Sequence, residues 1–178
     1  MLWTLFCAED ELEGTVIVSY GDIVYSKSIL QSLLASSADI AVAIDQDWET
    51  YWRTRNENPL DDAETLKLSS DERIVEIGQK PKALEEIEGQ YMGLMKFSTK
   101  GVAMLSEAYH DAKEKGNICG KPAKKAYMTD MLQEMIDLGY RVDAVTVHGE
   151  WVEVDTVEDL INEYNILRLK LLSDVSKN

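Results

Sequence analysis

Two aspartates in this sequence stand at matching places in the chain, each between a short run rich in apolar residues and a predicted helix. Asp22 follows the breaker Gly21 and the β-branched run 15–18 (TVIV), which predicts a strand covered on both faces, as in a parallel sheet. Asp155 follows the run 151–154 (WVEV). In open α/β sheets, ligands collect beyond the carboxyl ends of the strands, so both side chains are well placed for chemistry. Mg²⁺ is often held by one or two carboxylates together with phosphate oxygens and water. The pair therefore predicts a shared Mg²⁺ site.

Each aspartate also fits a local structural role. Asp22 can cap the segment that follows it, and Asp155 can replace Thr156 as the N-cap of the last helix, because Asp is common where a strand turns into a helix. Position alone leaves the two interpretations equally open for both residues.

A second acidic pattern, Asp45-Gln46-Asp47, follows the apolar run DIAVAI. An Asp-x-Asp sequence can bind a metal-bound sugar nucleotide, which offers a glycosyltransferase as an alternative function. The signal is weak in an acidic chain.

Three aromatic residues directly after that pattern share one face if the segment is helical, namely Trp48, Tyr51 and Trp52. Their rings could cage a choline-like cation. Packing into the core is the favoured interpretation, because aromatic stripes at this spacing usually bury themselves.

Alternating strand and helix patterns must position these residues. Buried or alternating apolar runs predict strands at 15–18, 39–45, 63–69, 73–78, 91–98, 141–149 and 151–155. Apolar residues at helical spacing predict helices at 28–36, 100–115, 127–139 and 156–172. Thr129 and Asp130 suit the entry of the third of these helices, and Thr156 with Asp159 resembles a capping box at the fourth.

The order of these elements predicts an α/β fold with a mixed, mostly parallel sheet, right-handed crossovers and helices on both faces. With 178 residues, the chain is expected to form a single domain, 1–178.

The composition limits the class of partner. Eighteen basic and thirty-three acidic residues give a formal net charge of −15, which disfavours nucleic acid and anionic membranes. Cys7 and Cys119 are far apart and match no metal spacing, as expected for a reduced, cytoplasmic protein. The first residues lack the basic region of a signal peptide, and no segment is apolar enough to span a membrane.

Five words of the sequence, in order and spacing, resemble the sugar-phosphate nucleotidyltransferase superfamily: YGDIVY, AETLKLSSDERIVEIGQKP, GQYMGLMKFS, AYMTDMLQEMIDLGYRV and GEWVEVDTVEDL. More narrowly, the chain resembles cytidylyltransferases that act on phosphocholine and 2-aminoethylphosphonate, including the domain fused to some phosphoenolpyruvate mutases. The resemblance runs from about Leu2 to Leu160. It implies the Rossmann-like fold of the nucleotide-diphospho-sugar transferases.

The resemblance implies a reaction and roles for several residues. A nucleotidyl group, CMP from CTP, would pass to a phosphate or phosphonate oxygen of a small acceptor, with release of pyrophosphate. Asp22 and Asp155 match metal-binding aspartates, so Mg²⁺ is the implied cofactor. Lys80 matches a catalytic lysine that contacts the phosphoryl group of the acceptor, although a solvated turn lysine is the alternative.

Other residues match the acceptor side of the family. Tyr91 and Gly93 correspond to its acceptor-binding strand, where Gln90 replaces the usual Glu. Glu153 lies on the same face of its strand as Asp155, so it can ligate the metal or bind an acceptor amine.

The family holds its nucleotide with an amino-terminal strand and a Gly-rich loop, and this sequence contains no counterpart. We therefore expect a fold that is truncated at its amino terminus. An incomplete enzyme, a homo-oligomer that covers an open sheet edge and a non-catalytic binding module all stay open. A monomeric mass in light scattering would argue against the homo-oligomer.

Overall fold

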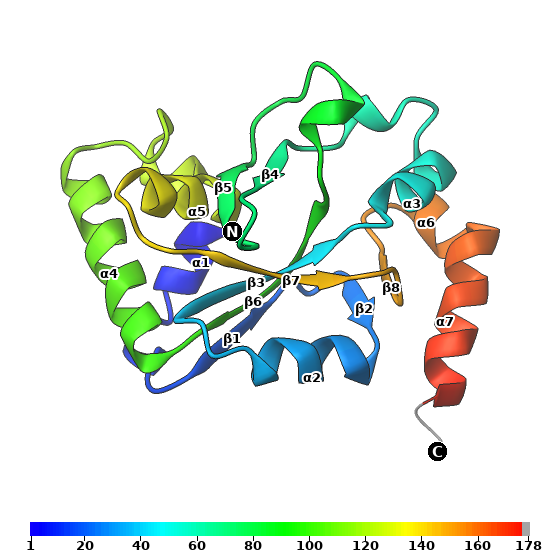
Figure 1. The fold of residues 1–178 in the computed structure, drawn as a ribbon, viewed down its shortest axis with the longest axis horizontal. Helices are drawn as coiled ribbons and strands as arrows, with labels where there is room; N and C mark the ends of the chain where they lie inside the picture. Colours follow the sequence, from blue (N-terminus) through cyan, green and yellow to red (C-terminus); the bar gives the residue numbers. More distant parts are fainter. Residues whose placement is uncertain (176–178) are drawn as a thin grey trace.

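The computed structural model describes residues 1–175 as helices packed around a central four-stranded sheet (Figure 1). The strands are β1 (Val16–Ser19), β2 (Ile23–Tyr25), β3 (Ile40–Asp45), β4 (Leu66–Leu68), β5 (Ile74–Ile77), β6 (Gln90–Phe97), β7 (Asp143–Val147) and β8 (Trp151–Glu153). The helices are α1 (Leu2–Phe6), α2 (Lys27–Ala35), α3 (Trp48–Arg55), α4 (Thr99–Glu114), α5 (Met128–Asp137), α6 (Val157–Ile161) and α7 (Glu163–Val175).

The central sheet has the strand order β1-β6-β3-β7. The α/β class and the mixed sheet are confirmed, but the expected predominance of parallel strands is wrong for this sheet. β6 runs antiparallel to both β1 and β3, and the parallel pairing is that of β3 with β7. Between β3 and β6 the chain forms α3, the β4–β5 hairpin and a loop. The α-helical crossover typical of parallel neighbours is not needed here, because an antiparallel strand can follow without one.

The first predicted strand also differs in its environment. The run 15–18 was expected to be covered on both faces in a parallel sheet, whereas β1 is a half-buried edge strand that pairs with β6. A short β-branched run is compatible with both places, because its composition does not encode strand direction.

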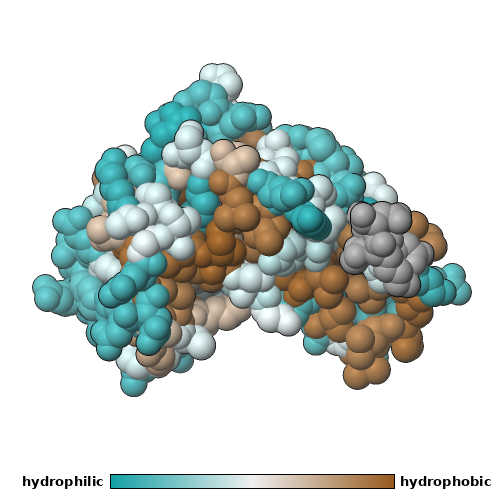
Figure 2. All heavy atoms as spheres, turned by 90° about the horizontal axis from the view of Figure 1, so that it is seen from below, coloured by the Kyte–Doolittle hydropathy of each residue, from teal (hydrophilic) through white to brown (hydrophobic). Residues whose placement is uncertain are grey.

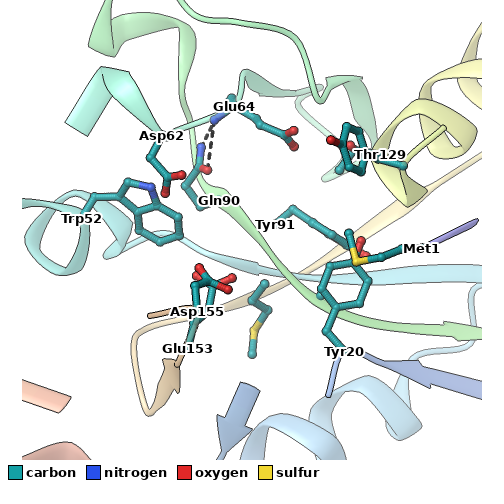
Figure 3. A pocket seen from close by; sticks show the side chains of 13 residues that line it. Met1, Tyr20, Trp52, Asp62, Glu64, Gln90, Tyr91, Thr129, Glu153 and Asp155 are labelled. Atoms are coloured by element: carbon teal, nitrogen blue, oxygen red, sulfur yellow. Dashed lines mark hydrogen bonds between the residues drawn. The ribbon is translucent and has the colours of Figure 1, made fainter. Parts of the chain in front are cut away.

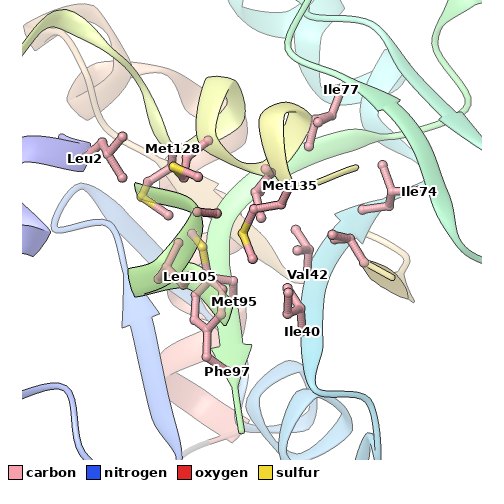
Figure 4. Close-up of a cluster of buried hydrophobic side chains, with 14 of the residues drawn as sticks. Leu2, Ile40, Val42, Ile74, Ile77, Met95, Phe97, Leu105, Met128 and Met135 are labelled. Atoms are coloured by element: carbon pink, nitrogen blue, oxygen red, sulfur yellow. The ribbon is translucent and has the colours of Figure 1, made fainter. Parts of the chain in front are cut away.

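β3 is the fully buried centre of the sheet, as its uninterrupted apolar pattern predicts. Its alternate residues face different cores, since successive side chains of a strand point to opposite faces. Ile40, Val42 and Ile44 join the core beneath α1, α4 and α5 (Figure 4). Ala41 and Ala43 join the core formed with α2, α3 and β8.

Two smaller strand pairs complete the fold. β4 and β5 form an antiparallel hairpin, which confirms two strands predicted from alternating residues. β2 pairs antiparallel with β8 although more than a hundred residues separate them in the chain. The sequence pattern did not predict β2, because its three residues lie between a turn and the helix signal of Ser26.

The predicted ends of the later helices are largely confirmed. Asp130 lies in the first turn of α5 and accepts a hydrogen bond from the N–H of Tyr127 at 2.7 Å. Thr156 and Asp159 form the expected capping box of α6. The single helix expected over 156–172 is divided, because the side chain of Asn162 accepts hydrogen bonds from the N–H groups of the first turn of α7 and restarts the helix there.

Helices α6 and α7 expose several large apolar side chains. These are Val157, Leu160, Ile161, Ile166, Leu167 and Leu171. Figure 2 shows apolar surface toward the right of the molecule. Within residues 1–175, the structure contains no helix with the length and apolar character needed to cross a bilayer.

Candidate functional site

The β2–β8 pairing brings the two candidate metal ligands to one end of a two-stranded ribbon. Ile23 lies opposite Glu153, and the N–H of Val154 donates to the backbone oxygen of Asp22 at 2.9 Å. Asp22 precedes β2 and Asp155 follows β8, so the two residues leave the ribbon at the same end. This register brings the segment that contains Asp22 close to the segment that contains Asp155, as expected from a shared site.

The carboxylate of Asp22 contains an atom that suits a cation. Its Oδ1 is buried and has no hydrogen-bond partner among the described residues. Burying an uncompensated carboxylate oxygen is costly, and a bound cation would remove that cost. Among residues 1–175, no group of three or more His, Cys, Asp or Glu side chains is placed so that it could hold a metal ion. Two carboxylates completed by phosphate oxygens and water still suit Mg²⁺.

A buried arginine at the end of α3 connects Asp155 to two other carboxylates. The Nη2 of Arg55 donates to Asp155 Oδ2 at 2.7 Å, and its Nη1 donates to Glu153 Oε2 at 2.5 Å. Its Nε donates to Asp159 Oδ1 at 2.9 Å. Burial lowers the pKa of Arg55, but these three acids outweigh burial and raise the pKa overall. The sequence patterns predicted none of these ion pairs.

Glu153 and Asp155 point into a cavity of about 410 Å³ (Figure 3). The cavity contains four carboxylate side chains, those of Asp62, Glu64, Glu153 and Asp155, and none of its described lining residues is Lys, Arg or His. Its other lining residues are Met1, Tyr20, Trp52, Gln90, Tyr91, Met92, Gly93, Tyr127 and Thr129. We call this space the acidic cavity.

The acceptor-strand residues proposed from sequence lie in the wall of the acidic cavity. Tyr91 and Gly93 belong to β6, and the ring of Tyr91 meets that of Tyr20 edge to face, with centroids 5.6 Å apart. Burial raises the pKa of Tyr20 to about 12 and also raises the pKa of Tyr91, so both phenols stay protonated near neutral pH.

Gly93 is required where Tyr20 crosses β6. Its φ is +77°, and a Cβ at this position would lie 2.6 Å from two ring carbons of Tyr20. The N–H of Tyr20 also donates to the Gly93 oxygen at 2.9 Å, which holds the two backbones together. A side chain on residue 93 would therefore push the ring out of its place.

Gly93→Ala is expected to lower the free energy of unfolding by about 2–4 kcal/mol, because it combines a positive-φ penalty with a steric clash. Gly116→Ala is the matched control, since Gly116 also has a positive φ, +83°, but its Cβ would meet nothing within 4 Å. We expect the control to cost about 1 kcal/mol. Urea denaturation measures both, and equal losses would show that Tyr20 yields without cost.

Gln90 fixes the position of Glu64 above the cavity. Its Nε2 donates to the backbone oxygen of Glu64 at 2.5 Å, and its Oε1 accepts from the N–H of Glu64 at 3.3 Å (Figure 3). Gln90 is thus committed to the backbone. The pKa of the Glu64 carboxyl is raised overall. Burial is the main cause and nearby Asp130 adds to it, while a hydrogen bond with Thr129 opposes it.

Lys80 does not line the acidic cavity. Its Nζ donates to the backbone oxygens of Leu60 and Asp61, and its side chain lines a neighbouring cavity of about 350 Å³ together with Lys121. Asp62 and Glu64 line both cavities, so the two spaces adjoin. The structure therefore places Lys80 beside the acidic cavity, and its ammonium group is bound to loop carbonyls.

Burial raises the pKa of Glu153 from its ordinary 4.5 to about 7, Arg55 lowers it, and Asp155 raises it again. The folded protein therefore holds the Glu153 proton more tightly than the unfolded chain does. The contribution of this group to the free energy of unfolding is fully present below pH 4.5 and is lost as the pH rises through about 7.

Glu153→Gln should consequently gain stability relative to the unsubstituted protein as the pH is raised from about 5 to 8. We expect the gain at pH 8 to be on the order of 2 kcal/mol. Urea denaturation in EDTA at several pH values measures the difference between the two proteins. A difference that does not change with pH would show that Glu153 ionises normally in the folded state.

Asp45 is committed to the fold, which argues against the Asp-x-Asp alternative. Its carboxylate is fully buried and accepts hydrogen bonds from the N–H of Gly149 at 2.9 Å and from Trp151 Nε1 at 2.8 Å. It also accepts from the N–H of Asp47 at 2.9 Å, whereas the Asp47 side chain is exposed beside His148. The two carboxylates of the motif therefore do not form one open site.

The aromatic residues of α3 confirm the packing interpretation. Trp48, Tyr51 and Trp52 are buried in the core that includes Trp151. Trp52 also lines the acidic cavity, and its Nε1 is buried without a hydrogen-bond partner in the described structure. The sequence patterns did not predict this donor, because helical spacing shows which side of a helix is buried but not which buried side chains line a cavity. They likewise did not predict the positions of Arg55 and Glu64.

Comparison with known proteins gives relatives that transfer nucleotidyl groups. The CTP:phosphoglutamine cytidylyltransferase of Campylobacter jejuni is 37% identical over 166 residues, which cover 90% of this chain and 65% of that protein. No protein-family model matches the chain.

Solved structures of low sequence identity share the fold. The inositol-1-phosphate CTP transferase from T. maritima has a TM-score of 0.66 at 19% identity, and 95% of this chain covers 61% of it. The nucleoside-diphosphate-sugar pyrophosphorylase from Vibrio cholerae RC9 has a TM-score of 0.54 at 13% identity, and 89% of this chain covers 59% of it. The chain thus spans about 60–65% of the length of these proteins.

Proposed function

We propose that this chain is a member of the sugar-phosphate nucleotidyltransferase superfamily and provides the metal and acceptor side of a cytidylyl transfer reaction. In this reaction a phosphate or phosphonate oxygen of a small acceptor attacks the α-phosphorus of CTP. The bond between the α- and β-phosphates breaks, and pyrophosphate leaves. Support comes from the cytidylyltransferase relative and from the two aspartates at one end of the β2–β8 ribbon. Asp155 lines the acidic cavity, whereas Asp22 lines a neighbouring cavity of about 310 Å³ that shares Met1 and Tyr20 with it.

Asp22 and Asp155 are the proposed ligands of Mg²⁺. When bound, the ion supplies positive charge for the phosphate oxygens at the reacting centre. The protein residues would act by position: the β2–β8 ribbon carries the two acids at one end, and β6 carries Tyr91 in the wall of the acidic cavity, where the acceptor would bind. Most of the catalytic effect would then come from orientation and electrostatics.

The charge of the acidic cavity favours an acceptor with a cationic group. Its four carboxylates outnumber the single guanidinium that pairs with two of them, that of Arg55 with Glu153 and Asp155. The excess negative charge would repel a phosphoryl group that entered without a cation and would attract an ammonium group. The rings of Tyr20, Trp52 and Tyr91 add faces that suit such a cation. Glu153 would then bind the amine, and Lys80 in the adjoining cavity would contact the phosphoryl group after leaving its loop carbonyls.

The experiment is a pyrophosphate-release assay with CTP, Mg²⁺ and one acceptor at a time. We would compare phosphocholine, 2-aminoethylphosphonate and phosphoglutamine with glucose 1-phosphate, which has a phosphate but no ammonium group. Turnover with an ammonium-bearing acceptor at least about tenfold above that with glucose 1-phosphate would support the proposal. Equal turnover would contradict the cationic acceptor, and no turnover in any combination would favour a non-catalytic binding module.

A further inference from the structure

Arg55 is held rigidly at the end of α3. Its side chain is only 7% exposed, and its guanidinium carbon lies 5.5 Å from the ring centroid of Tyr51 and 5.9 Å from that of Trp52. Both rings belong to the same helix and are buried in the core. The guanidinium therefore has little freedom to move, and groups bound to it are fixed relative to the core.

The guanidinium of Arg55 contacts three carboxylates: Nη1 donates to Glu153, Nε donates to Asp159, and Nη2 donates to Asp155 at 2.7 Å and to the second oxygen of Asp159 at 3.4 Å. Only a planar fork can reach three acids at fixed angles, and a lysine ammonium at this position could not reproduce these angles. Arg55 therefore sets the relative orientation of Glu153 and Asp155.

Asp159 ties the same arrangement to the backbone. Its Oδ2 accepts hydrogen bonds from the N–H groups of Asp155 and Thr156, at 3.1 and 3.0 Å. One acid thus fixes both the backbone of Asp155 and, through Arg55, the side chain of Asp155. A loop that served only to begin α6 would need the cap but not the arginine.

The cluster also has unbalanced charge. Three carboxylates surround one guanidinium, which leaves two negative charges in excess when all are ionised. Arg55 holds Asp155 through Oδ2, and no hydrogen bond to Asp155 Oδ1 is seen in the described structure. The Asp155 side chain is 46% exposed, so that oxygen can be reached from solvent.

We propose that Arg55 is a positioning residue of the Mg²⁺ site: by holding Oδ2 of Asp155 and Oε2 of Glu153, it presents the free oxygen of Asp155 to the cation. This inference rests on the proposed function, because it assumes that Asp155 is a metal ligand. It assigns no contact with the substrate to Arg55. Residues that orient metal ligands commonly change metal affinity by about 10- to 100-fold when replaced.

Arg55→Lys is the sharpest test, because it keeps the positive charge and removes only the fork geometry. We would titrate the full chain with Mn²⁺ and follow free Mn²⁺ by electron paramagnetic resonance. The expected result is a Kd for Mn²⁺ at least about tenfold higher than in the unsubstituted protein. An unchanged Kd in folded Arg55→Lys would overturn the inference.

The matched control is Arg53→Lys. Arg53 lies on the same helix, is 52% exposed and pairs with Glu49 one turn away, so its replacement should leave the Kd unchanged. An equal loss of affinity in both variants would overturn the inference. If Arg55→Lys does not fold by circular dichroism, Asp159→Asn serves instead, since its amide oxygen can still accept from backbone N–H groups while its ion pair with Arg55 is lost.

For Asp159→Asn we expect a Kd raised several-fold, and an unchanged Kd in the folded variant would overturn the inference. The two proposals can fail separately. If the unsubstituted protein binds no Mn²⁺, or if Asp155→Asn binds it equally well, the proposed metal site is wrong and the role of Arg55 falls with it. If Asp155→Asn weakens binding and the folded arginine variant does not, only the role of Arg55 is wrong.

Discussion

Replacing Asp155 by asparagine is expected to raise the Kd for Mn²⁺ at least about tenfold and to lower pyrophosphate release by two or more orders of magnitude. The substitution keeps the shape of the side chain and removes its charge. Asp155 and Asp22 are the only proposed acidic ligands, so losing one leaves a cation with a single carboxylate. Manganese titration and the pyrophosphate assay measure the two effects independently.

Asp47→Asn is the matched control for Asp155→Asn. Asp47 is also an exposed aspartate beside a helix, but its carboxylate lies near His148 and outside the acidic cavity. The same chemical change should there leave both the Kd and the turnover unchanged. Loss of metal binding in Asp47→Asn with none in Asp155→Asn would reverse the assignment and favour the Asp-x-Asp motif.

The strongest parts of the fold were predictable because their patterns depend on local burial. The uninterrupted run of β3 requires cover on both faces, and the structure places this strand at the centre of the sheet. The capping box of Thr156 and Asp159 is likewise encoded within four residues, and it forms as predicted. Strand direction is not local, which is why β1 and β6 were assigned to a mixed, mostly parallel sheet, whereas β6 runs antiparallel to both of its neighbours.

The candidate site was predictable only in its strongest signals. Asp22 and Asp155 could be selected because each follows a strand-like run, but the antiparallel β2–β8 pairing that relates them depends on a three-residue strand with no pattern of its own. Arg55 could not be selected from its surroundings, since its acidic partners lie about a hundred residues later in the chain. Such partners become visible only when the fold brings the segments together.

Asp45 is a residue for which the sequence pattern suggested a metal site that the structure does not support. An acidic triplet reads the same in sequence whether its first carboxylate faces solvent or the core. In the structure, Gly149 and Trp151 supply donors to Asp45 from more than a hundred residues away. Asp45 therefore connects β3 to the β7–β8 loop and the start of β8. Its carboxylate oxygens already accept hydrogen bonds from protein groups, so they are not free to bind a metal ion.

Asp45→Ala is consequently expected to cost about 3–5 kcal/mol of the free energy of unfolding. The buried N–H groups of Gly149 and Trp151 would lose their acceptor, and each unsatisfied buried donor costs about 1–3 kcal/mol. Urea denaturation followed by tryptophan fluorescence measures the loss, because the indole of Trp151 is itself one of the donors.

Asp45→Asn separates this structural role from a catalytic one. Its amide oxygen can still accept one of the hydrogen bonds, so we expect roughly half the loss of stability seen with alanine. Because Asp45 is enclosed by protein donors, the folded Asn variant should bind Mn²⁺ with an unchanged Kd. Full stability in the alanine variant, together with a loss of Mn²⁺ binding, would instead identify Asp45 as a metal ligand, since a carboxylate held only by a cation contributes little when the cation is absent.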